Sequence, residues 1–430
     1  MLRVIDVRTS RSFSRIIPPR RRSSTQKVEG IVEEILRRVD FEGDTAVRFY
    51  TKKFDGVELK TLSVSRKEIV NAFANADPKF VQLLRHAARN IRKFHERQRQ
   101  TSWIIKERNN SDLRQRFLPV DRAGVYVPGG KAAYPSTVLM NVIPAQVAGV
   151  KEILLVSPPD KSGRVHQDVL TAAAVLGIRT IFRIGGAQAI AALAYGTRTV
   201  PAVDMIVGPG NAFVATAKRM IFGSVGIDGI AGPSEVVILA DDSAQEDFVA
   251  ADMLAQAEHD ESASSILITT STRLAGGVQK ALKELLHTLP RKTIIAASLK
   301  QHGSIYLAKD IAQGADLVNL LAPEHLEIVT RDDEATLRKI KHAGSIFLGN
   351  YSPVVVGDYF AGPNHVLPTD RTARFASPLS VDSFMKKSSV IRYSKSMMRS
   401  VGSSVALFAE HEGLTAHALS AQLRLVEEEQ

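Results

Sequence analysis

The sequence predicts an α/β protein with two parallel-sheet domains, a helical N-terminal segment and a small C-terminal tail domain. Strand-like and helix-like segments alternate from about residue 121 to residue 300, and glycine turns join strands to the helices that follow. At 430 residues the chain is too long for one core of ordinary size, and 44% of its residues are hydrophobic. Alternating strands and helices build parallel sheets that are covered on both faces.

The front of the chain is expected to be helical behind a basic arm. Residues 1–26 are rich in Arg and Ser, but Asp6 and the lack of an apolar segment argue against a targeting peptide. Apolar residues recur at helical spacing from residue 27 to residue 54. Ser65, with Glu68 three positions later, is typical of a helix start, and two helices are expected from there to residue 98.

Two α/β domains and a tail are expected beyond the arm. The first domain is discontinuous and joins residues 27–129 to residues 235–380, so that the N-terminal helices complete it. The second comprises residues 130–234. Residues 381–430 form the tail domain, with a strand at 388–393 and a helix at 416–427.

Both domains are expected to follow the Rossmann-like order of strand, turn and helix. In the region from 121 to 234, strands are expected at 123–127, 152–157, 180–184 and 205–207, with helices at 136–147, 167–176 and 187–194 and a last one ending at 221. Beyond it, strands are expected at 236–240, 265–269 and 293–297 and near residues 304, 317 and 346, with helices at 244–259 and 272–286.

Composition excludes several classes of protein. The chain has no cysteine, which excludes disulfides, a thiol nucleophile and cysteine-held metal, so any metal must bind His, Asp, Glu or Gln. No apolar run reaches the roughly 20 residues of a membrane span, and a soluble, cytoplasmic protein is expected. A net charge of +11 suggests nucleic-acid binding, but no aromatic stacking motif accompanies it, so neither nucleic acid nor membrane is an expected partner.

Three glycine turns are candidate nucleotide-binding positions. Pro128-Gly129-Gly130, Gly185-Gly186 and Gly208-Pro209-Gly210-Asn211 each follow a strand and precede a helix. Nucleotides bind at the carboxyl ends of parallel strands, beside helix N-termini. However, Phe213 stands where the third glycine of the dinucleotide fingerprint would fall, and ordinary connections between strands and helices remain an alternative interpretation.

Two further patterns could hold a metal or move a proton. Gln256 and His259 lie three positions apart near the end of a predicted helix, and an imidazole with an amide oxygen suits zinc if a carboxylate joins them. A helix-terminal His favoured by the helix dipole is the alternative. Glu324 and His325 are adjacent and are expected to follow an apolar strand, although a helix start explains this spacing equally well.

Isolated candidates complete the set: Asp358 and His365 in a loop rich in glycine and proline, and Glu412 and His417 in the tail. A lone His is usually a surface residue or one whose hydrogen bonds are satisfied within the protein. Only convergence of several such residues would therefore indicate a site.

The motifs occur together in an order that resembles the histidinol dehydrogenase family. The similar stretches are AGVYVPGGKAAYPSTVLMNVIPAQVAGV, RIGGAQAIAALAYGT, DMIVGPGNAFVATAKR, GIDGIAGPSEV, AQAEHD, LLAPEHLEI, GSIFLGNYSPVVVGDYFAGPNHVLPT and EHEGLTAHALS. They cover the chain from about residue 121 to residue 420 in order, and such a collinear set is far more specific than any single motif.

The resemblance implies an NAD-dependent zinc enzyme. Tyr126, Gln188 and Asn211 match the family's NAD-binding positions, one in each glycine turn. Zinc would be held by four positions, the last of them supplied by the tail of a partner subunit: Gln256, His259, Asp358 and His417. A chain of this kind would work as a homodimer with active sites shared between subunits.

The same resemblance implies oxidation of L-histidinol through the aldehyde to L-histidine with two NAD, in histidine biosynthesis. Residues at the substrate-binding positions are Ser234, Gln256, His259, His325, Asp358, Glu412 and His417, with His365 a further contact. His325 is the expected base for the hydroxyl proton, and Glu324 the expected base for the water that hydrates the aldehyde. A relative acting on another small polar alcohol is the alternative, which Glu324, His325, His365 and Glu412 together disfavour.

Overall fold

The computed structural model describes residues 2–10, 13, 26–129 and 133–426. The chain divides into two compact units, one of residues 1–98 and 120–384 and the other of residues 99–119 and 385–430. Gly130 and the arginines of the basic arm at 11, 15 and 20–22 lie outside the described residues. Within the described parts, no helix is long and apolar enough to cross a membrane.

A five-stranded parallel sheet forms one half of the first unit. Its strand order is β6-β5-β4-β7-β8, with bounds β4 (Arg122–Tyr126), β5 (Glu152–Val156), β6 (Thr180–Phe182), β7 (Met205–Val207) and β8 (Gly226–Ile227). The intervening helices are α5 (Pro135–Ala148), α6 (Gln167–Val175), α7 (Gly186–Tyr195) and α8 (Ala212–Ile221). Alternation of strand and helix therefore holds throughout this half, as the sequence predicts.

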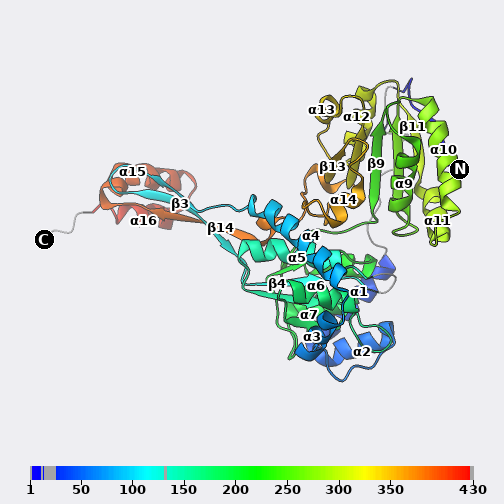
Figure 1. Ribbon diagram of the computed structural model, residues 1–430. Helices are drawn as coiled ribbons and strands as arrows, with labels where there is room; N and C mark the ends of the chain where they lie inside the picture. Colours follow the sequence, from blue (N-terminus) through cyan, green and yellow to red (C-terminus); the bar gives the residue numbers. More distant parts are fainter. Residues whose placement is uncertain (1, 11–12, 14–25, 130–132, 427–430) are drawn as a thin grey trace. The chain divides into compact units, whose positions relative to one another are not determined.

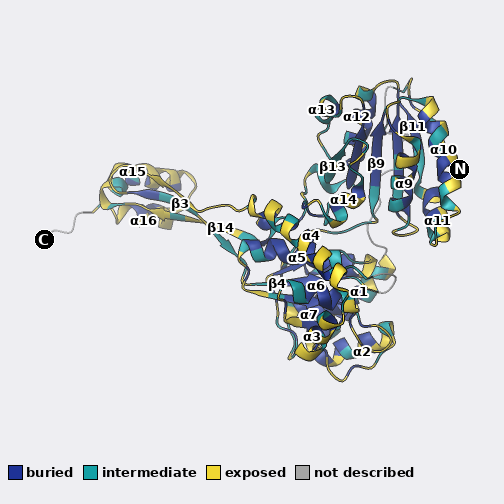
Figure 2. Cartoon of the chain, viewed as in Figure 1, coloured by how far each residue is buried: buried dark blue, intermediate teal, exposed yellow. Residues whose placement is uncertain are grey.

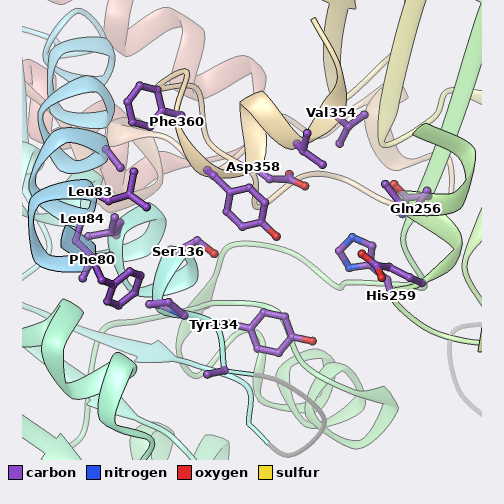
Figure 3. A pocket seen from close by; sticks show the side chains of 18 of the residues that line it. Phe80, Leu83, Leu84, Tyr134, Ser136, Gln256, His259, Val354, Asp358 and Phe360 are labelled. Atoms are coloured by element: carbon purple, nitrogen blue, oxygen red, sulfur yellow. The ribbon is translucent and has the colours of Figure 1, made fainter. Parts of the chain in front are cut away.

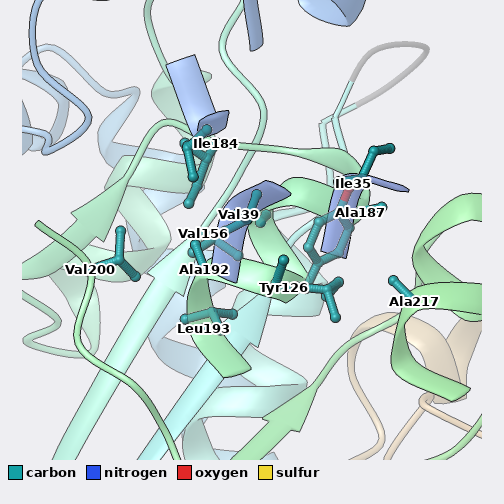
Figure 4. Packing of buried hydrophobic residues seen from close by; sticks show 14 of the residues in the cluster. Ile35, Val39, Tyr126, Val156, Ile184, Ala187, Ala192, Leu193, Val200 and Ala217 are labelled. Carbon is teal, nitrogen blue, oxygen red and sulfur yellow. The ribbon is translucent and has the colours of Figure 1, made fainter. Parts of the chain in front are cut away.

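The N-terminal helices pack on this five-stranded half. They are α1 (Gln26–Glu42), α2 (Asp44–Asp55), α3 (Arg66–Ala74) and α4 (Pro78–Glu96), and Ser65 caps α3 with the expected capping box. Apolar residues of α1 and α2, including Ile35 and Val39, join Tyr126 and Leu193 in one buried cluster (Figure 4). The expectation that these helices complete the domain of residues 235–380 is therefore wrong.

A six-stranded parallel sheet forms the other half. Its order is β1-β11-β10-β9-β12-β13, with bounds β1 (Arg3–Asp6), β9 (Glu235–Ala240), β10 (Ser264–Thr269), β11 (Ser304–Leu307), β12 (His325–Val329) and β13 (Ser345–Leu348). Its helices are α9 (Glu246–Ala257), α10 (Thr272–Leu286), α11 (Lys292–His302), α12 (Ile311–Leu321), α13 (Asp333–Leu337) and α14 (Val354–Tyr359). The front of the basic arm thus supplies an edge strand, β1, to this sheet.

Alternate residues of β9 face opposite sides of the six-stranded sheet, as the pleat requires. Val236 and Ile238 pack in the cluster that contains α9, α10 and α11, whereas Val237 and Leu239 pack in the cluster that contains α12. Figure 2 shows the result, with dark blue strands between helices whose outer faces are exposed. Both faces are covered, which is why these strands are continuous apolar runs.

Two predicted strands of this half are helices. Residues 293–297 lie in α11, and Leu317 lies in α12. Both segments are short apolar runs, for which the helical and strand patterns cannot be separated by periodicity.

The second unit is a small antiparallel sheet with two helices. Strands β2 (Trp103–Lys106), β3 (Asp112–Pro119) and β14 (Met385–Arg392) lie in the order β14-β3-β2, and α15 (Lys395–His411) packs against α16 (Thr415–Gln422). The expected tail domain is thus joined by residues 99–119, which the sequence did not assign to it.

Candidate active site

The carboxyl edge of the five-stranded sheet carries the predicted glycine turns. Tyr126, the last residue of β4, is buried, and its hydroxyl accepts a hydrogen bond of 3.1 Å from the Gly186 backbone N–H. Burial raises the pKa of Tyr126 to about 12. Gln188, one turn into α7, is buried and its Oε1 has no hydrogen-bond partner among the described residues. An acceptor without a donor is a place where a ligand can supply one.

The third glycine turn is held by a buried ion pair. Gly208 has φ of +112°, and a Cβ there would lie 2.1 Å from the Tyr126 carbonyl oxygen, so only glycine fits. The Gly208 N–H donates to Asp228 Oδ2 at 2.7 Å, and its carbonyl accepts from Lys218 Nζ at 3.0 Å. Lys218 and Asp228 also pair with each other. The Gly208 peptide is therefore fixed on both sides.

Asn211 begins α8 immediately after this turn. Its Oδ1 accepts from the backbone N–H groups of Phe213 and Val214 at 3.1 and 3.2 Å, as an N-cap residue does. The N-termini of α7 and α8 both lie at this edge of the sheet, where the helix dipole favours a phosphate group.

A cavity of about 340 Å³ in the first unit brings together Gln256, His259 and Asp358 (Figure 3). Gln256 lies in the last turn of α9, His259 follows the end of that helix, and Asp358 lies in the last turn of α14. The Gln256 Nε2 atom is buried with no hydrogen-bond partner among the described residues. An amide, an imidazole and a carboxylate in one cavity are a donor set that fits zinc.

Among the described residues, no group of three or more His, Cys, Asp or Glu side chains converges to hold a metal. The expected ligand set differs from such a group because it contains an amide and a residue of the other unit. Burial raises the pKa of Asp358 to about 7 and lowers the pKa of His259. A carboxylate whose charge is poorly solvated gains more from a cation beside it.

His325 is buried next to this cavity with a defined tautomer. Its Nδ1 lies 3.1 Å from the Glu235 carbonyl oxygen, which can only accept, so Nδ1 carries the proton. Its Nε2 is buried without a hydrogen-bond partner in the described structure and lies 3.8 Å from Asp358 Oδ1. Burial lowers the pKa of His325 to about 4. Nε2 is therefore an unprotonated, unused base near neutral pH.

Glu324 is buried beside His325. Its Oε2 accepts from the Glu235 backbone N–H at 2.8 Å and lies 3.5 Å from His325 Nδ1. Burial raises the pKa of Glu324 well above its ordinary value, and the carboxylates of Glu235 and Asp358 add to this effect. A raised pKa makes the carboxylate a stronger base.

The Glu324 and His325 pair precedes a strand, contrary to expectation. Helix α12 ends before it, Ala322 adopts φ of +43°, and β12 begins at His325. The Glu235 backbone, which orients both side chains, stands at the start of β9. The sequence pointed only to its neighbour Ser234, because a backbone contact leaves no side-chain signal.

His365 belongs to the same cluster as His325 and Asp358. Its Nδ1 lies 3.0 Å from the Asp358 carbonyl oxygen, and the three residues line a second cavity of about 210 Å³. Burial lowers the pKa of His365 to about 4. Ser234, at the residue before β9, is half-buried.

Glu412 and His417 lie in the second unit. Both are exposed, and both line a groove between α15 and α16 together with apolar residues that include Val405 and Phe408. The structure thus brings these two tail residues together in one unit and the other candidate residues together in the first.

Comparison with known proteins identifies the family of the chain. The family model for histidinol dehydrogenase matches residues 18–425. The chain belongs to the histidinol dehydrogenase family.

Relatives and a solved structure of the histidinol dehydrogenase family match nearly the whole chain. Histidinol dehydrogenase from Halalkalibacterium halodurans is 50% identical over 99% of this chain and 100% of its own length, and that from Bacillus subtilis is 53% identical over 94% of each. The crystal structure of histidinol dehydrogenase from Elizabethkingia anophelis has a TM-score of 0.93 and 38% identity, covering 99% of this chain and 98% of that one. Members of the family are NAD-dependent oxidoreductases that use zinc.

Proposed function

We propose that the chain oxidises L-histidinol through L-histidinaldehyde to L-histidine with two NAD, completing histidine biosynthesis. The observation that carries this proposal is the cavity in which Gln256, His259 and Asp358 meet beside the free Nε2 of His325. Family membership supplies the reaction, and the geometry supports the roles proposed for the residues.

Gln256, His259 and Asp358 would hold zinc from this chain. When bound, zinc would supply a Lewis-acidic anchor for the nitrogens of the substrate, and the three side chains would set the position of that anchor in the cavity. Ser234 and His365 flank the same region and are assigned to substrate binding.

His325 takes the hydroxyl proton of histidinol on Nε2. The Nδ1–H group continues to donate to the Glu235 carbonyl oxygen, so the ring keeps its orientation while Nε2 changes protonation state. A pKa of about 4 keeps Nε2 unprotonated and ready at neutral pH. Loss of this proton, together with transfer of a hydride from the hydroxyl-bearing carbon to NAD, would produce the aldehyde.

Glu324 removes a proton from the water that adds to the aldehyde. The hydrate then loses a second hydride to a second NAD and becomes the carboxylate. The Glu235 N–H holds one oxygen of Glu324, which leaves the other for the water. Burial of both groups excludes bulk solvent and protects the reactive aldehyde.

Tyr126, Gln188 and Asn211 would bind NAD at the carboxyl edge of the five-stranded sheet. Tyr126 fixes the Gly186 turn through its hydroxyl, and Gln188 offers an unpaired acceptor. Asn211 caps α8, the helix whose N-terminus would favour the phosphates.

Glu412 and His417 would complete the site of a partner subunit in a homodimer. Support comes from their shared groove in the second unit, whose exposed apolar residues are suited to burial against another chain. His417 would be the fourth zinc ligand and Glu412 a contact to the substrate.

The metal assignment is tested by His259→Asn. We expect the purified variant to lose both zinc, measured by elemental analysis, and the NADH released from histidinol. Its far-UV circular dichroism should match wild type, because His259 lies beyond the end of α9 and Asn is similar in size and polarity. Full zinc occupancy would remove His259 from the ligand set.

The shared site is tested by mixing two inactive variants, His417→Ala and His259→Ala. A heterodimer would contain one site built from two intact halves, so partial activity should return after subunit exchange. Exchange that is demonstrated by mass labels without any return of activity would show that each chain completes its own site.

A further inference from the structure

A buried carboxyl pair lies next to the proposed zinc site and has no part in the chemistry described so far. Glu327 on β12 is 2% exposed, and its carboxyl lies close enough to that of Asp252 on α9 for each to affect the pKa of the other. Its Oε1 also accepts from the Val354 backbone N–H, the first residue of α14, at 3.0 Å. Glu327 therefore joins three elements through polar contacts.

Each of these elements carries a residue of the proposed site. Strand β12 carries His325, two positions before Glu327 and hence on the same face of the sheet. Helix α9 carries Gln256 four positions after Asp252, on the same helix face. Helix α14 carries Asp358 four positions after Val354. The Glu327 carboxyl therefore links the three elements that carry the proposed base, His325, and two proposed zinc ligands, Gln256 and Asp358.

Stability alone does not explain an acid at this position. Val329 on the same face of β12, Met253 on α9 and Val354 pack in an apolar cluster. A buried carboxyl is costly there, and an apolar side chain of similar size would serve packing at least as well. Burial raises the pKa of Glu327 well above its ordinary value and the pKa of Asp252 to about 6, which favours a proton shared between the two.

We propose that Glu327 and Asp252 are positioning residues that hold α9 and α14 at the separation at which Gln256, His259 and Asp358 can bind one zinc ion. This inference rests on the proposed zinc site and names the contacts that set its geometry. Outer contacts of this kind typically change metal affinity by about 10- to 100-fold when removed.

The test is zinc affinity of the metal-depleted protein, measured by competition with a chromogenic zinc chelator. Glu327→Leu should bind zinc about 10- to 100-fold more weakly. Glu327→Gln should bind nearly as tightly as wild type, because its amide can accept from the Val354 N–H and donate to the Asp252 carboxylate. Equal weakening in both variants, or none in Glu327→Leu, would overturn the proposal.

Two controls separate positioning from general loss of stability. Asp44 is a buried carboxylate on the other half of the unit, where it accepts from the hydroxyls of Thr197 and Thr199. Asp44→Leu should lower the melting temperature and leave zinc affinity unchanged, and weakened zinc binding in it would count against the proposal. If Glu327→Leu fails to fold, Asp252→Ala at a half-buried position must show the loss of affinity instead.

A wrong positioning role can be distinguished from a wrong assignment of the zinc ligands. If His259→Asn and wild type bind zinc equally, the ligand assignment is wrong. If His259→Asn loses zinc while Glu327→Leu and Asp252→Ala bind zinc with wild-type affinity, the ligand assignment is supported and the positioning role is wrong.

Discussion

The two parallel sheets of the first unit place their proposed functional residues at opposite edges. In the five-stranded sheet these residues follow strands β4, β6 and β7, at the carboxyl edge beside the N-termini of α7 and α8. In the six-stranded sheet, Glu235 and His325 begin their strands at the amino edge, and Gln256 and Asp358 lie in the last turns of their helices.

The difference matches the charge of the proposed ligands. Helix N-termini present N–H groups and a partial positive charge, which suits the phosphates of NAD. Helix C-termini present carbonyl oxygens and a partial negative charge, which suits zinc. One α/β architecture thus offers an anion site at one edge and a cation site at the other.

The amino edge of the six-stranded sheet should carry the proton transfers, and the first prediction separates them. Glu324→Gln should retain zinc and oxidise histidinol to the aldehyde level, but form histidine about a hundred- to ten-thousandfold more slowly. His325→Asn should fail with histidinol and keep more activity when the aldehyde is supplied. Single-turnover NADH release with each substrate measures both. The division of labour would be contradicted by equal losses with both substrates in both variants.

A substitution at the carboxyl edge of the five-stranded sheet should weaken NAD binding and leave zinc binding unchanged. Lys218→Met leaves the buried Asp228 carboxylate without its cationic partner, which should destabilise the fold by about 3–5 kcal/mol, measured by urea unfolding. The KM for NAD should rise because the Gly208 turn loses one of its holding contacts, while zinc content stays at the wild-type level. The double variant Lys218→Met with Asp228→Asn should recover part of the stability. Loss of zinc in Lys218→Met would break the separation between the two edges.

The buried acids of the amino edge should make stability depend on pH. Burial and the nearby Asp370 raise the pKa of Glu235 to about 7 from 4.5. A raised folded-state pKa means that the contribution to stability is full below about pH 4.5 and is lost as pH rises through 7. Glu235→Gln, which still offers an acceptor to the Asp370 N–H, should match wild type near pH 4.5 and be more stable at pH 8 by up to about 3 kcal/mol. Thermal unfolding of the metal-free proteins at both pH values measures this, and parallel profiles would contradict it.

Sequence reasoning predicted the alternation and the glycine turns because both depend on local patterns. It misassigned residues 293–297, whose short apolar run fits either a strand or a helix. It also attached the N-terminal helices to the wrong sheet, because their apolar faces do not indicate which partner they cover.

The sequence predicted which residues belong to the site but not how they are arranged in space. Gln256 and His259 were found by their helical spacing, and Asp358 was an isolated candidate until the resemblance assigned it to the same metal. Glu327 had only a weak signal, a single acid within the apolar run HLEIV, and its partner Asp252 had none. The role of Glu235 depends on its backbone, which any residue would supply, so sequence alone could not indicate it.

The most direct measurement of the central claim is the stoichiometry of NADH released from a limiting amount of histidinol, before and after zinc is removed with a chelator. We expect two NADH for each histidinol, loss of this activity as zinc leaves the protein, and its return when zinc is restored. Release of two NADH by protein shown to be free of metal would contradict the zinc-anchored site, and release of only one would contradict the four-electron oxidation.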